Sequence, residues 1–175
     1  MEPMQSQYIQ YILFTLLGMA AVIDVRTYRI PNWLTGPAAL VGLCLHTFAD
    51  QLSGFMFSLE GIALGLGLFV ILYACGWMGA GDVKLFAAVG SFLGPAQTIS
   101  AAILIAFAGG LLAFGILGFH RGWRTTGWQL WSYVQGILLT RCVVGLIPAQ
   151  DIAPKVPYAV AISLGTIGSY WWYPL

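Results

Sequence analysis

The chain has 175 residues, of which 59% are hydrophobic and only 7% are charged. A water-soluble domain carries about a quarter charged residues, so lipid must cover most of this surface. The formal net charge of +1 leaves no basic face for nucleic acid, and the three cysteines form no CxxC pair, so we expect no metal and no cofactor.

Six apolar segments are long enough to cross a membrane, where a span needs roughly 20 residues or fewer if neighbours shelter it. They cover residues 8–23, 33–49, 58–76, 83–94, 96–119 and 156–173. Gly94-Pro95 separates the fourth segment from the fifth. We therefore predict that residues 1–175 form a single all-α membrane domain with about six transmembrane helices.

A seventh stretch, 128–147, has polar residues at helical spacing and is interrupted by Arg141. This pattern favours an amphipathic helix that lies in the membrane interface. The apolar helices are also rich in glycine, for example at Gly65 and Gly67. We interpret these glycines as positions of close helix packing.

The basic residues predict the orientation of the chain. If the N-terminus lies outside and the six segments span, all seven lysines and arginines fall on one side. The positive-inside rule makes that side cytoplasmic. Glu60 is then expected near the outer boundary of the third span. The first segment is a retained span and not a signal peptide, because Glu2 precedes it and Arg26 and Arg29 follow it.

Two acidic residues, Asp24 and Asp82, come to the same cytoplasmic face in this topology. Asp24 ends the first span, and Asp82 opens the fourth. Each has a structural explanation by itself: Asp82 is a typical helix N-cap, and Asp24 has Arg26 and Arg29 as neighbours for an ion pair. Ionisable groups at membrane depth nevertheless indicate function, and two on one face strengthen that interpretation.

Two adjacent carboxyl groups are sufficient for peptide hydrolysis, because they can share one proton. The ionised group takes a proton from the attacking water, and the protonated group donates to the scissile carbonyl. Helix dipoles favour Asp82, at a helix N-terminus, as the base and Asp24, at a C-terminus, as the acid. Gly79 and Gly81 flank Ala80 before Asp82 and would admit an extended substrate backbone; an ordinary Gly-rich turn is the other explanation.

Three motifs together resemble the type IV prepilin peptidase family of GxGD aspartic proteases, specifically its short Tad/Flp-type form. Asp24 is followed by basic residues and Ile30-Pro31-Asn32, Gly79 to Lys84 reads G-x-G-D-x-K, and Pro157-Tyr158 opens the last apolar segment. Ala159 stands where the family usually has Gly. The resemblance extends over nearly the whole chain.

The resemblance implies that Asp24 and Asp82 are the catalytic pair of an endopeptidase in the bacterial cytoplasmic membrane. Its expected partner is a prepilin of the Flp-like type, cut after a short basic leader at the cytoplasmic face. Longer family members carry a cysteine-containing insert that methylates the product. Only residues 26–32 separate the first two segments here, so we predict cleavage without methylation.

Four further residues are candidates for substrate-binding or supporting roles. Lys84 would stabilise negative charge beside Asp82 or simply snorkel, and Asn32 would orient a substrate carbonyl or form a turn. Pro157 and Tyr158 would shape a substrate groove, or begin a helix and anchor it at the interface.

Three other functions fit part of the pattern. Presenilin-type proteases share only the G-x-G-D motif. A small transporter would use Asp24 and Asp82 as ion ligands, although such acids more often lie near the membrane midplane. An inactive pilus-assembly scaffold would use them only as helix caps.

Overall fold

The computed structural model describes residues 3–74, 78–121 and 157–172. Within these ranges the fold is all-helical, as predicted, with α1 (Pro3–Thr27), α2 (Asn32–Ala74), α3 (Ala80–Arg121) and α5 (Tyr158–Trp172). In the described part of the chain, three stretches are long and apolar enough to cross a membrane, namely Gln7–Thr27, Asn32–Ala74 and Ala80–Ile116. The predicted interfacial helix at 128–147 lies outside the described residues.

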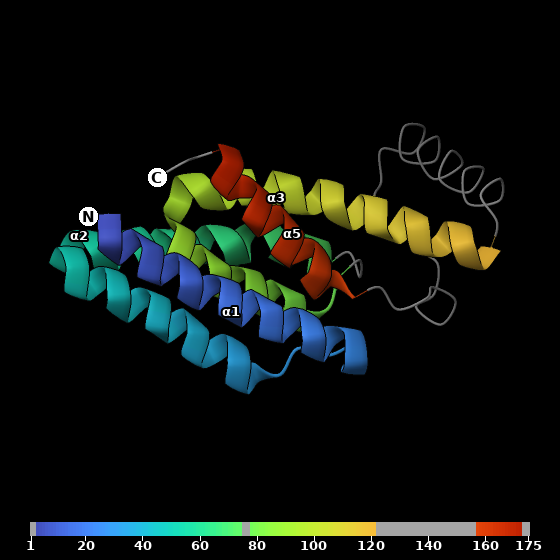
Figure 1. Cartoon of the computed structure of the whole chain (residues 1–175), viewed down its shortest axis with the longest axis horizontal. Helices are drawn as coiled ribbons and strands as arrows, with labels where there is room; N and C mark the ends of the chain where they lie inside the picture. The colour runs from blue at the N-terminus through green and yellow to red at the C-terminus, as the bar shows by residue number, and fades with distance from the viewer. Residues whose placement is uncertain (1–2, 75–77, 122–156, 173–175) are drawn as a thin grey trace.

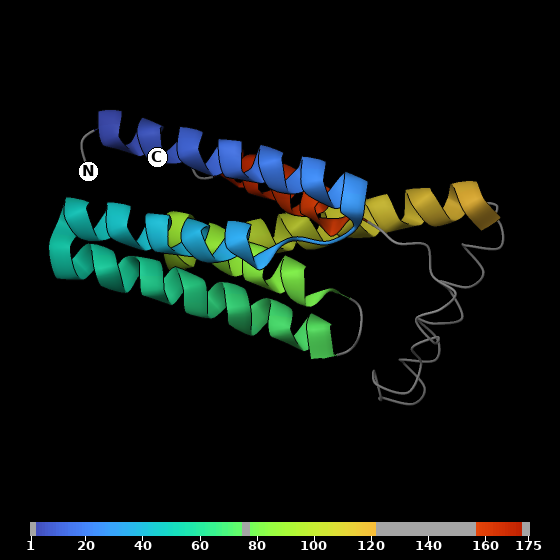
Figure 2. The same cartoon turned by 90° about the horizontal axis from the view of Figure 1, so that it is seen from below.

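Helix α2 reverses direction at Asp50 and Gln51, whose backbone angles are not helical (Gln51 φ 51°). The two halves run side by side, because Gly54 lies directly against the carbonyl of His46 and the Ser58 hydroxyl donates to the Gly42 carbonyl at 3.4 Å. Figure 2 shows this reversal at the end of the bundle where the N-terminus lies. The division between 33–49 and 58–76 is therefore confirmed as a reversal.

The second half of α2 starts earlier than the sequence predicted, immediately after Gln51 and not at residue 58. Its first turns contain Ser53 and Gly54, which lowered the apolar character of this stretch. Gly54 is nevertheless helical because it packs against the first half of α2. As a consequence, Glu60 lies well inside the helix and not at its boundary.

Helix α3 reverses at Gly94, which has φ 69°. Pro95 follows and suits the first position of the next helical segment, where its missing N–H costs nothing. The Thr98 hydroxyl donates to the Gly94 carbonyl at 2.6 Å. The predicted separation at Gly94-Pro95 is thus a sharp turn within one long helical element (Figure 1).

Small residues hold the second half of α2 against the first half of α3. A Cβ on Gly61 would collide with the Gly90 carbonyl, and one on Gly65 would lie 2.9 Å from the Phe86 carbonyl. One turn further, Phe69 stacks on Phe86 with ring centroids 4.2 Å apart. In lipid, such close backbone approach replaces the hydrophobic effect as a source of packing energy, and here it fixes the helix that carries Asp82.

Helix α5 packs between α1 and the second half of α3 (Figure 1). On the α1 side, Tyr170 meets Phe14 edge-on with centroids 5.4 Å apart, and the Ser163 hydroxyl donates to the Leu17 carbonyl at 3.3 Å. On the α3 side, a Cβ on Gly165 would collide with Ile105. These contacts set the N-terminus of α5 beside the C-terminal turn of α1.

Candidate active site

Asp24 lies in the last two turns of α1 and is buried, with 4% of its surface exposed. Its Oδ2 accepts a hydrogen bond of 2.9 Å from the backbone N–H of Ala159. Ala159 is the second residue of α5 and is fully buried. Asp24 therefore satisfies one of the free N–H groups of a helix that begins 134 positions later in the chain. The neighbouring Arg26 and Arg29 are exposed. Because Asp24 is buried, it does not form the ion pair with these arginines that was considered as its structural explanation.

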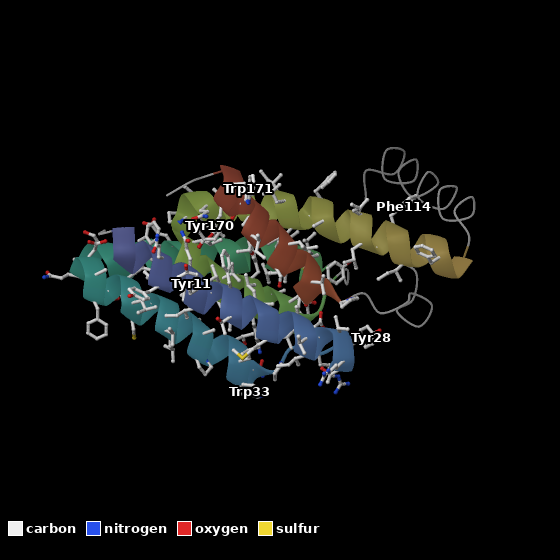
Figure 3. All side chains as sticks on the ribbon, in the orientation of Figure 1. Tyr11, Tyr28, Trp33, Phe114, Tyr170 and Trp171 are labelled. Carbon is white, nitrogen blue, oxygen red and sulfur yellow. The ribbon has the colours of Figure 1, made fainter. Side chains whose placement is uncertain are left out.

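The chain turns sharply after Asp24. Tyr28 adopts a left-handed conformation (φ 51°), and its N–H donates to the Asp24 carbonyl at 2.7 Å. The Thr27 hydroxyl donates to the Ile23 carbonyl at 2.9 Å and contacts the Arg29 carbonyl at 3.0 Å. Figure 3 shows Tyr28 and Trp33 on either side of this turn, at the end of α1. The turn brings buried Ile30 back toward α3.

Asp82 lies in the first turn of α3 and closes that turn on itself. Its Oδ2 accepts the N–H of Gly79 at 3.1 Å, while its own N–H donates to the Gly79 carbonyl, also at 3.1 Å. The first bond is one half of a capping box, with the acid at the third helical position; the second is made by the backbone, because Gly79 has no side chain. The structural explanation of Asp82 is thus partly right: it caps the helix from inside the first turn.

Gly81 brings the two motifs together. A Cβ at this position would lie 3.1 Å from the Cβ of Ile30 and 3.2 Å from its carbonyl oxygen. The absence of a side chain therefore allows the first turn of α3 to touch the turn that follows Asp24. For Gly81 the structure provides an internal packing role that the sequence did not suggest. A Cβ on Gly79 would meet the Asp82 Oδ2 at 3.1 Å.

The carboxyl groups of Asp24 and Asp82 lie within electrostatic range of each other. Asp82 also lies within range of the Tyr158 hydroxyl. The Tyr158 ring lies beside Gly109 of α3, where an added Cβ would be 3.5 Å from Cε1. The residues 24, 82 and 158, from three separate motifs, therefore converge at one end of the bundle.

Lys84 and Asn32 contact each other and link the same two motifs at the surface. The Lys84 Nζ donates to the Asn32 Oδ1 at 2.9 Å, and both side chains are exposed. Pro157 precedes α5, and its carbonyl accepts the N–H of Val160 at 3.2 Å. Pro157 and Tyr158 therefore stand at the start of the helix, which was the structural alternative to a role in a substrate groove.

The assignment of acid and base from helix dipoles did not include the N-terminus of α5, which lies beside Asp24. From sequence, only Asp82 stands at a helix N-terminus. In the structure Asp24 ends α1 but also faces the N-terminus of α5 through Ala159. Since both acids accept a helix N-terminal N–H, the dipole argument no longer separates their roles.

The sequence did not indicate the hydrogen-bond partner of Asp24, the backbone N–H of Ala159. The only available signal was the position of Ala159 directly after Pro157-Tyr158, at the start of an apolar segment. Within residues 3–74, 78–121 and 157–172, no group of three or more His, Cys, Asp or Glu side chains is arranged to hold a metal ion.

Comparison with known proteins identifies the family. Residues 11–115 match the type IV leader peptidase family. Two relatives from Burkholderia pseudomallei, strains 1026b and K96243, are each named prepilin leader peptidase/N-methyltransferase and are 35% identical over 113 residues. The match covers 61% of this chain but only 36% of each relative, and no solved structure matches significantly. The family match includes both aspartates and extends over more than half of the chain, which therefore belongs to the type IV leader peptidase family.

Proposed function

We propose that the chain is an aspartic endopeptidase that removes the leader of type IV, Flp-like prepilins, with Asp24 and Asp82 as its catalytic pair. The observation that carries the proposal is the convergence of these two acids at one end of the bundle. They come from separate helices and lie within electrostatic range of each other. Family membership and the names of the two relatives support a prepilin as the substrate class.

In the proposed reaction, the ionised member of the pair takes a proton from water, and the water oxygen attacks the scissile carbonyl carbon. The protonated member donates its proton to the carbonyl oxygen. The tetrahedral intermediate then collapses, the C–N bond breaks, and the leaving amine takes up a proton from the pair. Because interacting carboxyl groups titrate together, the acid and base roles belong to the pair and not to a single residue.

The proposed membrane arrangement has six spans: one in α1, two in α2, two in α3 and one in α5. The reversals at Asp50-Gln51 and Gly94 support two passes each for α2 and α3. Arg26 lies in the last turn of α1, Arg29 in the turn that follows it, and Lys84 in the first turns of α3, all near the aspartates. By the positive-inside rule this end faces the cytoplasm of a bacterial inner membrane, with the N-terminus outside.

The proposed activity is cleavage without methylation. Helix α1 ends at Thr27 and α2 begins at Asn32, so the first aspartate motif runs directly into the second span. The expected product of this chain alone is a mature pilin with an unmodified N-terminus. Mass spectrometry of that product tests this point, and an N-methylated terminus would contradict it.

The test of the peptidase proposal is cleavage of a prepilin in membranes by Asp24→Asn and Asp82→Asn variants. General acid and base groups contribute about 10²- to 10⁴-fold each, so both variants should lose detectable processing. Asp50→Asn is the matched control, because it makes the same chemical change at the opposite end of the bundle. Normal cleavage by either active-site variant rejects the pair.

The capping contacts favour one other function, that of an inactive assembly scaffold. Both acids accept N–H groups at helix starts, and loss of a cap costs about 0.5–2 kcal/mol of stability. A scaffold would show this loss of stability in Asp24→Ala and Asp82→Ala, whereas the Asn variants keep an accepting oxygen. Its native form would leave the prepilin uncut. Cleavage by the native chain therefore separates the two functions.

A further inference from the structure

Lys84 occupies an unusual position for a charged side chain. From Val83 to Gly94, the first half of α3 is buried at every residue except Lys84. A lysine that served only to mark the cytoplasmic side could stand on an outer helix end, as the exposed Arg26 does at the end of α1. Lys84 instead stands on a helix that the rest of the bundle encloses. The positive-inside rule alone therefore does not account for a lysine at this position.

The ammonium group of Lys84 contacts the start of α2. Its Nζ donates to the Oδ1 of Asn32 at 2.9 Å. Asn32 is the first residue of α2 and follows the turn that leads out of the helix of Asp24. An amide oxygen is a neutral acceptor, so the contact is a directional hydrogen bond and not an ion pair. It joins the helix of the second aspartate to the segment that continues from the first.

Gly81 makes a second contact with the same segment. Gly81 and Lys84 are three residues apart and therefore lie on one face of α3. A Cβ on Gly81 would lie 3.1 Å from the Cβ of Ile30, two residues before Asn32. The segment needs such support, because Tyr28 holds a left-handed conformation (φ 51°) that persists only where surrounding contacts determine it. Two contacts one helical turn apart fix both the height of α3 and its rotation about its own axis.

Asp82 points to a different side of α3. It is about 100° from Gly81 and about 160° from Lys84 around the helix axis. Asp24 of α1 lies within electrostatic range of Asp82. The face with Gly81 and Lys84 thus holds the turn, and the face with Asp82 meets the other aspartate. A rotation of α3 that broke the contact of Lys84 would therefore also change the direction of Asp82.

We propose that Lys84 and Asn32 are positioning residues, whose hydrogen bond holds Asp82 in the orientation in which it shares a proton with Asp24. Neither side chain touches the reacting atoms. Catalysis is sensitive to such positioning, because a displacement of about 1 Å can cost about 100-fold in rate. This role differs from both interpretations of Lys84 from sequence, as a positive charge beside Asp82 and as a snorkelling lysine. It rests on the peptidase function proposed above.

The first test is a double-mutant cycle in prepilin cleavage, measured per folded molecule in lipid. Lys84→Met keeps the apolar stem and removes the ammonium group, and Asn32→Ala removes the acceptor. Each should lower kcat about 10-fold, the order of one hydrogen bond to a charged group, and leave KM within about twofold. The double variant should be no slower than the slower single variant, because both changes break one contact. Losses that multiply, or a rise in KM in place of a fall in kcat, would overturn the proposal.

Conservative variants and a charge control accompany the cycle. Lys84→Arg retains a donor and Asn32→Asp retains an accepting oxygen, so both should cleave within about threefold of the native rate. Arg26→Met is the matched control, because Arg26 is exposed and stands two residues after Asp24, as Lys84 does after Asp82. It should cleave within about twofold of the native rate. An equal loss in Arg26→Met and Lys84→Met, or no rescue by either conservative variant, would contradict the proposal.

A second test follows the position of α3 without cleavage. Spin labels at Tyr11→Cys on α1 and Ala80→Cys on α3 occupy exposed positions, in a chain whose native cysteines are replaced by Ser. The distribution of distances between the labels should broaden in Lys84→Met and Asn32→Ala and stay native in Arg26→Met. Unchanged distributions in both variants overturn the proposal, whether or not the chain cuts a prepilin. A native chain that leaves the prepilin uncut rejects the peptidase function alone, and the distance measurement then decides the role of the contact.

Discussion

The two ends of the bundle are built in different ways. At one end, α2 and α3 reverse through tight turns at Gln51 and Gly94, and the His46 side chain lies 3.1 Å from the Phe92 carbonyl near the end of the first half of α3. At the other end, Asp24 accepts a hydrogen bond from Ala159 of α5, 135 residues away in the chain. Polar groups at the first end stabilise turns, whereas those at the second end bring separate motifs together.

This difference indicates where substitutions should act. Changes at the end with the reversals should reduce stability and leave catalysis per folded molecule intact. Changes at the other end should reduce catalysis. This should hold even where the residue that is changed is a glycine or contributes only its backbone N–H.

Outside the two aspartates, the largest effect is expected at Gly81, where any side chain is pressed against Ile30. Gly81→Leu should separate the two aspartate motifs and reduce the rate of prepilin cleavage about 100-fold or more, the usual consequence of a displacement of about 1 Å. The measurement is the single-turnover cleavage rate of purified protein in lipid. Gly36→Leu is the control, because Gly36 is an open glycine in the first turns of α2, at the same end of the bundle. An equal loss in both variants would contradict the role given to Gly81.

A smaller loss is expected when the N–H of Ala159 is removed. Pro is tolerated in the first turn of a helix, and Ala159→Pro deletes the donor to Asp24. A hydrogen bond to a charged group contributes about 1.5–3 kcal/mol, so the cleavage rate should fall about 10- to 100-fold. Ala159→Gly retains the N–H and restores the residue usual in the family, so it should cleave within about twofold of the native rate. Equal rates for the Pro and Gly variants would show that this hydrogen bond does not position Asp24.

The smallest effect on catalysis is expected at His46. His46→Leu leaves the Phe92 carbonyl without its partner in the buried interior, which should lower the free energy of unfolding by about 1–3 kcal/mol. Denaturation in mixed detergent micelles measures this loss. The cleavage rate per folded molecule should stay within about twofold of the native rate, since the hydrogen bond carries no reacting group. If the cleavage rate falls by a larger factor than the fraction of folded protein, His46 also affects catalysis. The two ends of the bundle would then not differ in the way described.

Much of the fold follows from local sequence. Apolar length predicted the helices, and Gly94-Pro95 predicted the reversal of α3, because both residues act on their own backbone. The start of the second half of α2 was misplaced, because Ser53 and Gly54 lower the apolar character of its first turns and the contact of Gly54 with His46 is not visible in local sequence.

The site was only partly predictable for a similar reason. Charge topology brought Asp24 and Asp82 to one face, but the Ala159 N–H and the contact of Gly81 with Ile30 arise only when distant segments pack. The contact of Lys84 with Asn32 also depends on how α3 packs against the start of α2, and hydropathy does not contain that information.

The central claim is that Asp24 and Asp82 act as one catalytic unit. The most direct measurement compares single-turnover cleavage by Asp24→Asn, Asp82→Asn and the double variant. Groups that act as a unit show strongly non-additive losses. We predict that the double variant is no slower than the slower of the two single variants. Losses that multiply, or a single variant that cuts at the native rate, would contradict it.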